Sequence, residues 1–320
     1  YHCLSSGINA EYMGREAGGG REMGETDGGG GGGGGIEEIS TRAENRIRNQ
    51  LFWNLGNFLR KLLFSVLSAG PIPRHIACIL DGNRRFARKW NLSPGGGHVA
   101  GFLAVIRMLR YCYELGVKYV TVYAFSIDNY RRRPKEVQLL MTLFHIKLTE
   151  LAEVDGLVQQ LGVRIYFTGN IKMLGEPLKM AMDRVMEKTS AHTRAVLVVC
   201  LAYTSTDEIT HSIQLCADRD RKSAARVVGA ADADGDGGAG VGLEEVERNM
   251  YMAVAPEPDV LVRTSGETRL SNFLLWQTAV CLLYSPETLW PEIGLWDLVW
   301  AVMCFQRGHR YTASTKKKLP

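Results

Sequence analysis

The stretch VKYVTVYAF, residues 117–125, is apolar at most positions and rich in β-branched and aromatic side chains. A second stretch, RAVLVVCLAY at residues 194–203, has the same character. Strands with two buried faces have this composition, because helices cover both sides of a parallel sheet. The two stretches therefore predict central strands of a parallel sheet.

Strand-like and helix-like segments alternate outward from these two stretches, beginning at Ile72. We expect strands at about 75–80, 117–124, 162–168, 195–202, 259–263 and 279–284, and helices at about 84–91, 98–115, 135–153, 176–190, 205–220 and 294–308. Crossovers of this length join parallel strands. The sequence thus predicts one α/β domain with a mostly parallel six-stranded sheet flanked by helices.

Segments of other composition surround and interrupt this domain, which we place at residues 71–310. Residues 1–44 are glycine-rich and expected to be disordered. A low-complexity insertion is expected at about 217–242, and a basic tail at residues 311–320.

Residues 45–70 predict a basic amphipathic helix, because apolar side chains recur at helical spacing among arginines and a lysine. This helix has two interpretations. It packs on its own domain or on a partner, or it lies on an anionic membrane surface through residues 45–68.

The composition excludes several classes. The 320 residues carry 38 basic and 34 acidic side chains, a net charge of +4, which is too weak to indicate nucleic acid. The 7 cysteines form no CxxC pair, so we expect buried, reduced thiols and no zinc site. No apolar run reaches the roughly 20 residues of a membrane span, and no secretory signal is recognisable.

Four polar clusters follow predicted strands: DGNRR at 81–85 with GGGH at 95–98, SIDNYRRRP at 126–134, YTSTDE at 203–208, and RTSGETRLSN at 263–272. Ligands of open α/β sheets bind outside the carboxyl ends of the strands. The clusters bring four arginines to that edge: Arg85, Arg132, Arg263 and Arg269. Arginine forks and glycine N–H groups hold phosphate oxygens, so a polyanion site is predicted.

Asp81 is the one acid in the first cluster. It either forms a structural ion pair with the arginines or holds Mg²⁺, which commonly takes one or two carboxylates plus substrate phosphates. The sequence lacks the P-loop, GxSxG and HExxH motifs, and it has no GxGxxG after a strand.

These residues resemble the cis-prenyltransferases, the undecaprenyl and dehydrodolichyl diphosphate synthases with their rubber-transferase-like plant members. The resemblance rests on HIACILDGNRRFARKW, GGGHVAGF, YAFSIDNYRR and DVLVRTSGETRLSNFLLWQ, and covers about 71–307. It implies a hydrophobic tunnel beside the sheet. It also implies cis addition of isopentenyl diphosphate to an allylic diphosphate, commonly farnesyl diphosphate, giving a long-chain polyprenyl diphosphate for dolichol. A non-catalytic subunit of the same complex is the alternative.

The resemblance also assigns the site. It implies Mg²⁺ at Asp81, and catalytic roles for Asp81, Asn83, Arg85, His98 and Asn129. It implies diphosphate binding by Gly82, Arg84, Arg85, Arg132, Arg263, Arg269 and Ser271, of which the last three match residues that bind the diphosphate of isopentenyl diphosphate. The extra arginine of RRRP leaves Arg131 or Arg133 as alternatives to Arg132. Tunnel candidates are Leu103, Ile106, Leu109, Leu139, Leu140, Leu143 and Phe144, with ordinary core as the alternative for each.

Two departures from the bacterial single-subunit pattern imply a partner. Pro94 stands where those members have an arginine, and Leu282 where they have a second metal-binding glutamate. Both resemble catalytic subunits that work with a Nogo-B-receptor-like subunit. We therefore expect weak activity of the chain alone, no nucleic acid, and a peripheral place on the cytosolic face of the endoplasmic reticulum, with cytosol as the alternative.

Overall fold

The computed structural model describes residues 54–151, 160–228 and 242–316. The predictions for residues 1–44 lie outside this part, as do residues 45–53 of the predicted amphipathic helix. The chain divides into residues 1–58 and 59–320. Of the first unit, only residues 54–58 are described, and they are helical.

The second unit contains a sheet of six parallel strands in the order β3-β4-β2-β1-β5-β6. Their bounds are β1 His75–Ile79, β2 Tyr119–Ser126, β3 Val163–Thr168, β4 Ala195–Tyr203, β5 Val260–Arg263 and β6 Leu282–Tyr284. All six predicted strands and the parallel sheet are confirmed.

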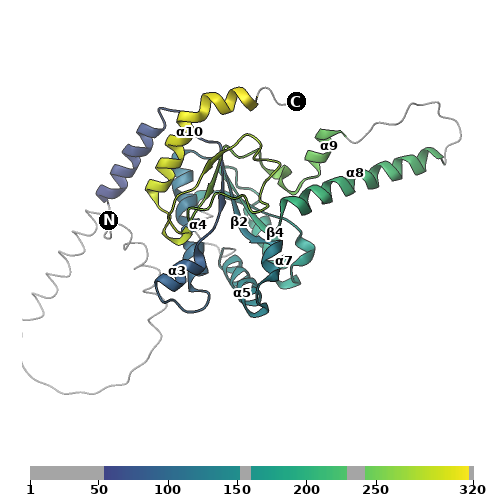
Figure 1. Ribbon diagram of the computed structural model, residues 1–320, viewed down its shortest axis with the longest axis horizontal. Coiled ribbons are helices and arrows are strands. Elements are labelled where there is room, and N and C mark those ends of the chain that lie inside the picture. Colours follow the sequence, from purple (N-terminus) through teal and green to yellow (C-terminus); the bar gives the residue numbers. More distant parts are fainter. Residues whose placement is uncertain (1–53, 152–159, 229–241, 317–320) are drawn as a thin grey trace, which may run out of the picture. The chain divides into compact units, whose positions relative to one another are not determined.

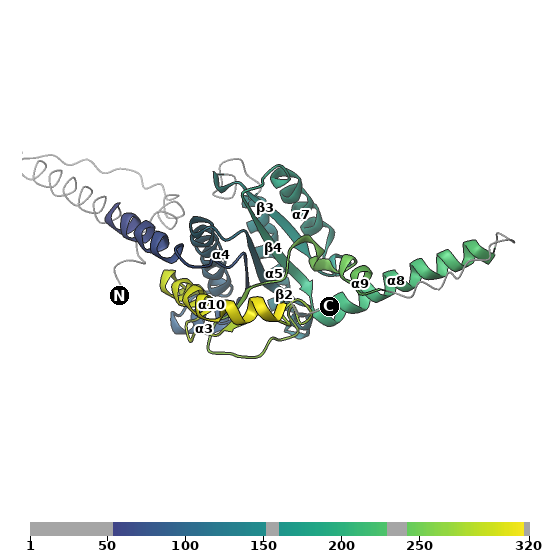
Figure 2. The same cartoon turned by 90° about the horizontal axis from the view of Figure 1, so that it is seen from above.

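The helices that follow these strands are α3 Asn83–Lys89, α4 Gly96–Leu115, α5 Pro134–Leu151, α7 Glu176–Thr189, α8 Ser205–Val228, α9 Leu243–Arg248 and α10 Leu295–Lys316. Short 3₁₀ helices lie at η1 Ile127–Arg131, η2 Ile171–Met173, η3 Tyr251–Val254 and η4 Trp290–Glu292. Figure 1 shows α4, α5, α7 and α10 arranged around the sheet and α8 extending away from it, and Figure 2 shows α7 beside β3.

Alternating side chains of the strands face two cores. On β1, Ile76 and Cys78 join the larger core with residues of α4, α5, α7 and α10. Ala77 and Ile79 join the smaller core with Met252 and the segment around Phe273. This two-sided burial explains the apolar strand sequences, because neither face of the sheet meets water.

Two helices extend past their predicted ends. α8 continues to Val228, within the stretch assigned to the insertion, and α10 continues to Lys316, within the predicted tail. Residues 217–228 are rich in alanine, arginine and other good helix formers, which explains the extension of α8. Residues 229–241 and 317–320 lie outside the described part.

The segment 59–67 is helical, as predicted for the C-terminal part of residues 45–70. Phe64 and Leu67 are buried in the larger core, whereas Leu59, Leu62 and Val66 are exposed. One side of this segment therefore packs on its own domain, and the other side is apolar and uncovered. Cys78, Cys112, Cys200 and Cys216 are buried free thiols, as expected.

Candidate active site

The site lies where β1, β2 and β5 end. Ile79 on β1 is level with Tyr123 on β2 and with Arg263 on β5. The loop after β1 and the first turn after β2 therefore open at the same edge of the sheet as Arg263. In the sheet, β2 lies on one side of β1 and β5 lies on the other. Open α/β sheets bind ligands at such a point, outside the carboxyl ends of the strands.

Asp81 is fixed by arginines on two elements. Its Oδ2 accepts a hydrogen bond from Arg263 Nη2 at 2.7 Å, and its Oδ1 accepts one from Arg85 Nη2 at 3.3 Å. Burial alone would raise the pKa of this carboxyl, but the hydrogen bonds and charges of Arg263 and Arg85 bring it below its usual value. Asp81 is therefore an ionised carboxylate at neutral pH.

The predicted ion pair of Asp81 is confirmed, and this geometry also fits a metal. Asp81 lines a cavity together with Arg132 and Arg269. No group of three or more His, Cys, Asp or Glu side chains among the described residues could hold a metal. A divalent ion here would be bound by Asp81 and by oxygens of a phosphate ligand, a donor set that Mg²⁺ commonly takes.

Gly82 allows the sharp turn from β1 into α3. Its φ is +111°, and a Cβ at this position would lie 2.6 Å from Ser265 Oγ and 3.1 Å from Leu289 Cα. Only glycine fits such a backbone without strain. The turn places Asn83 at the first position of α3, directly beside the cavity.

Asn83 is held between β1 and α4. Its Nδ2 donates to Leu80 O at 3.1 Å, and its buried Oδ1 has no partner within the described part of the chain. A Cβ on Gly101 would lie 2.2 Å from that Oδ1, and a Cβ on Gly97 would lie 2.1 Å from Asn83 O. The two glycines let α4 approach Asn83 closely, so that its Oδ1 is enclosed against α4.

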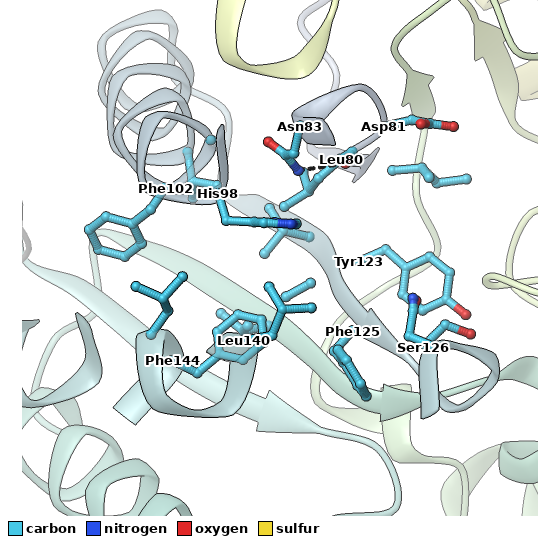
Figure 3. Close-up of a pocket in the computed structure, with 18 of the residues that line it drawn as sticks. Leu80, Asp81, Asn83, His98, Phe102, Tyr123, Phe125, Ser126, Leu140 and Phe144 are labelled. Atoms are coloured by element: carbon cyan, nitrogen blue, oxygen red, sulfur yellow. Dashed lines mark hydrogen bonds between the residues drawn. The ribbon is translucent and has the colours of Figure 1, made fainter. Parts of the chain in front are cut away.

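His98, on the first turn of α4, points into the cavity (Figure 3). Burial and the positive charges of Arg132 and Arg84 lower its pKa to about 4, although Glu136 acts in the opposite direction. The ring is therefore neutral at physiological pH and acts as a hydrogen-bonding group rather than a cation.

The segment after β2 forms η1 and contributes Asn129 and Arg132 to the cavity wall. Arg132 Nη1 donates to Glu136 at 3.1 Å. Of the three consecutive arginines, Arg132 lines the cavity and Arg131 does not, since the Arg131 side chain is 87% exposed beside Asp128. The geometry thus favours Arg132 over its neighbours.

The segment after β5 adds Arg269 and Ser271. The buried Arg263 donates through Nη1 to Ser271 Oγ and to Arg269 O, both at 2.6 Å. The Arg269 side chain is 63% exposed and pairs with Glu267. Arg263 therefore shapes this loop, and Arg269 lines the cavity beside it.

Most predicted site residues line one cavity: Asp81, Asn83, Arg84, His98, Asn129, Arg132, Arg263, Arg269 and Ser271. Gly82 and Arg85 do not line it. The 42% exposed side chain of Arg85 lies outside and acts on the cavity through Asp81. Pro94 and Leu282 do not line it either.

The cavity has a volume of about 670 Å³, and its deeper wall is apolar. Figure 3 shows Phe102 and Phe144 at the end away from Asp81. Four tunnel candidates line it, namely Ile106, Leu140, Leu143 and Phe144, whereas Leu103, Leu109 and Leu139 do not. Leu109 faces the core instead, with 1% exposure.

The sequence prediction missed the strand residues of this wall, which are Val122, Phe125, Ile165, Phe167, Leu197 and Val199. Alternation along β3 and β4 could have found Ile165, Phe167, Leu197 and Val199, because they point to the side of the sheet that α4 and α5 cover. Val122 and Phe125 are three residues apart, and an irregularity in β2 between Tyr123 and Phe125 brings both to that side. A cationic mouth and a hydrocarbon interior suit a ligand with a diphosphate head and an isoprenoid tail.

Comparison with known proteins agrees with this geometry. A family model described as putative undecaprenyl diphosphate synthase matches residues 79–313. This chain belongs to that family. A dehydrodolichyl diphosphate synthase of Solanum lycopersicum is 51% identical over 275 residues, 83% of this chain and 95% of that one. A dehydrodolichyl diphosphate synthase complex subunit of Homo sapiens is 39% identical over 246 residues, 77% of this chain and 70% of that one.

A solved structure has the same fold. Lavandulyl diphosphate synthase from Lavandula x intermedia, crystallised with dimethylallyl diphosphate, has a TM-score of 0.62 and 26% identity. The match covers 73% of this chain and 95% of that one.

The predicted membership of the cis-prenyltransferase family is confirmed. The chain is an enzyme that transfers prenyl groups and elongates them with cis geometry. The alternative of a non-catalytic subunit is not favoured, and the DGNRR loop is complete in this chain. Within the described residues, no helix is long and apolar enough to cross a bilayer.

Proposed function

We propose that this cis-prenyltransferase extends farnesyl diphosphate with isopentenyl diphosphate to a long-chain polyprenyl diphosphate of the dehydrodolichyl type. The observation that carries the proposed prenyl transfer is a cavity of about 670 Å³, with Asp81 and arginines at its mouth and apolar side chains deeper inside. The tomato relative bears the name of a dehydrodolichyl diphosphate synthase.

The chemistry follows from this polarity. The C–O bond of the allylic diphosphate breaks, and its electron pair leaves with the diphosphate. The double bond of isopentenyl diphosphate then forms the new C–C bond, and a proton is lost to solvent or to the released diphosphate. Arg84, Arg132 and the Asn83 Nδ2–H that is not bonded to Leu80 O would stabilise the negative charge on the departing group. His98, which is neutral, would hydrogen-bond a phosphate oxygen.

Mg²⁺ is the proposed metal, with Asp81 as its protein ligand. When bound, it would supply positive charge to the leaving diphosphate. Arg263 holds the Asp81 carboxylate in place and keeps it ionised, so that the metal and the arginines would neutralise the same diphosphate.

The activity is tested by incorporation of radiolabelled isopentenyl diphosphate with farnesyl diphosphate and Mg²⁺, followed by chain-length analysis. We expect weak incorporation by the chain alone and strong incorporation with a Nogo-B-receptor-like subunit. The human relative is named as a complex subunit, and Pro94 and Leu282 replace residues of single-subunit enzymes. Robust activity alone would overturn the partner proposal, and no incorporation in either mixture would overturn the proposed function.

We further propose that the enzyme lies peripherally on the cytosolic face of the endoplasmic reticulum, with cytosol as the alternative. Support comes from the exposed Leu59, Leu62 and Val66 next to basic residues of the same segment. Co-sedimentation with anionic liposomes should fall when these three residues are changed to serine. Equal liposome binding by wild type and by the triple serine variant would indicate that the protein contacts the membrane through another surface.

A further inference from the structure

The loop that carries Ser271 has an unusual backbone. Ser271, Asn272 and Leu274 all have positive φ, at 49°, 57° and 47°. Residues other than glycine seldom adopt this conformation, and they keep it only where the surrounding contacts impose it. The contacts that impose it here come from another part of the chain.

The start of α8 holds the loop through four hydrogen bonds. Asn272 Oδ1 accepts from Thr206 N at 3.1 Å and from Thr206 Oγ1 at 3.0 Å. Asn272 O accepts from Ser205 N at 2.8 Å, and Ser205 Oγ accepts from Leu275 N at 2.9 Å. Both the backbone and the side chain of Asn272 are therefore tied to α8.

The far end of the same segment is tied down as well. The buried Gln277 donates through Nε2 to Glu208 Oε2 at 3.0 Å, and Glu208 Oε1 accepts from Met252 N at 2.8 Å. Residues 271–277 are therefore fixed at both ends against the first turns of α8.

This attachment continues into the site. Ser271 precedes Asn272 and accepts a hydrogen bond from Arg263, which in turn binds Asp81 at 2.7 Å. A continuous series of contacts thus runs from Thr206 through Asn272 and Ser271 to Arg263 and Asp81. Moving Asn272 would move the loop that presents Ser271 and Arg269.

We propose that Thr206 and Asn272 are positioning residues, which hold the Arg269–Ser271 loop in the conformation that binds the diphosphate of isopentenyl diphosphate. The proposal rests on the proposed function, because it names the substrate that this loop receives. Loss of the Thr206 hydroxyl should weaken isopentenyl diphosphate binding more than allylic diphosphate binding.

Thr206 is the better probe of the two. Asn272 lines the cavity, so its replacement could remove a direct contact with substrate. Thr206 is exposed and does not line the cavity, so it acts only through Asn272. Thr206→Val removes the hydroxyl at nearly constant shape, and Thr206→Ser is the matched control that keeps it.

The test is steady-state kinetics with both substrates varied, using the full chain with its partner subunit. Thr206→Val should raise the KM for isopentenyl diphosphate by about fivefold, the scale of one hydrogen bond. The KM for farnesyl diphosphate and the thermal midpoint should stay near wild type, and Thr206→Ser should behave as wild type.

Three outcomes would overturn the proposal. The first is an unchanged KM for isopentenyl diphosphate in Thr206→Val. The second is a parallel loss of both substrates' binding and of thermal stability, which indicates a merely structural role. The third is a defect in Thr206→Ser as large as that in Thr206→Val. An inactive wild-type complex would instead refute the proposed function itself.

Discussion

At the residue scale, Asp81 forms one of the two interactions that the sequence left open, the ion pair, and is the proposed ligand for the other, the metal. The carboxylate forms an ion pair with the buried Arg263 and also faces the cavity mouth. An ion pair and a metal ligand are compatible in one residue, because each carboxylate oxygen has more than one lone pair. The two roles are separable by substitution.

Asp81→Asn should abolish turnover while it keeps most of the stability, because the amide oxygen still accepts a hydrogen bond from Arg263. We expect a loss of about 10²-fold or more in the rate of prenyl transfer. Asp81→Ala should lose turnover equally and also about 1–3 kcal/mol of stability, since Arg263 is left unpaired. Turnover rates and urea unfolding of the two variants measure these effects on catalysis and on stability. Equal turnover of Asp81→Asn and wild type would rule out the metal role.

His98 gives a prediction in pH. Its pKa of about 4 lies below the usual 6.5, so the folded chain favours the neutral ring. The contribution of the neutral ring to the free energy of unfolding is fully present above the unfolded-state pKa. It is lost as the pH falls toward the folded-state pKa. The free energy of unfolding should therefore decline less between about pH 7 and pH 5 in His98→Gln than in wild type. Parallel pH profiles would contradict the assigned pKa.

At the element scale, the contact between α3 and α4 sets the mouth of the cavity. Gly97 and Gly101 let α4 meet Asn83 at distances that no side chain allows. This contact also positions His98, one residue after Gly97. The orientation of α3 therefore depends on two glycines of α4.

Gly101→Ala should force Asn83 away from α4, at a cost of about 1–3 kcal/mol in stability, and should raise the KM for the allylic diphosphate. Gly308→Ala on α10 is the control, because nothing lies within 4 Å of its Cβ. That change should stabilise the helix by about 0.5–1 kcal/mol and leave KM unchanged. A Gly101→Ala enzyme with wild-type KM would show that the contact does not set the site.

The elements also show why part of the site was predictable. Asp81 and Arg132 follow β1 and β2, and Arg263 ends β5. Parallel strands bring their carboxyl ends together, so the sequence pattern suffices to predict the cluster. The tunnel was predicted less well, because helical periodicity does not tell Leu143, which lines the cavity, from Leu139, which does not. The attachment of Asn272 to Thr206 joins residues 66 positions apart and depends on left-handed backbone that no local motif indicates.

At the scale of the whole molecule, one cavity contains both a charged region and an apolar region. Charged residues gather where β1, β2 and β5 end, and the apolar wall continues between α4, α5 and the sheet. A single ligand with a charged head and a hydrocarbon tail would contact both regions. Its binding should stabilise the whole folded domain, because only the folded chain assembles the cavity.

Metal removal tests this coupling. An unreactive thio analogue of farnesyl diphosphate with Mg²⁺ should raise the thermal midpoint, corresponding to about 2.7 kcal/mol at 100-fold excess over Kd. Chelation of the metal should reduce the shift in wild type, whereas in Asp81→Asn the shift should be small with and without chelator. If the thermal shift of wild type had the same size with and without chelator, that result would contradict a metal-assisted diphosphate site.

The most direct measurement is a crystal structure of the chain with Mg²⁺ and the same thio analogue. The account predicts the diphosphate beside Asp81, Arg84 and Arg132, with the metal on Asp81 and the isoprenoid tail running toward Phe102 and Phe144. A diphosphate bound away from Asp81, or a tail outside the cavity between α4, α5 and the sheet, would contradict it.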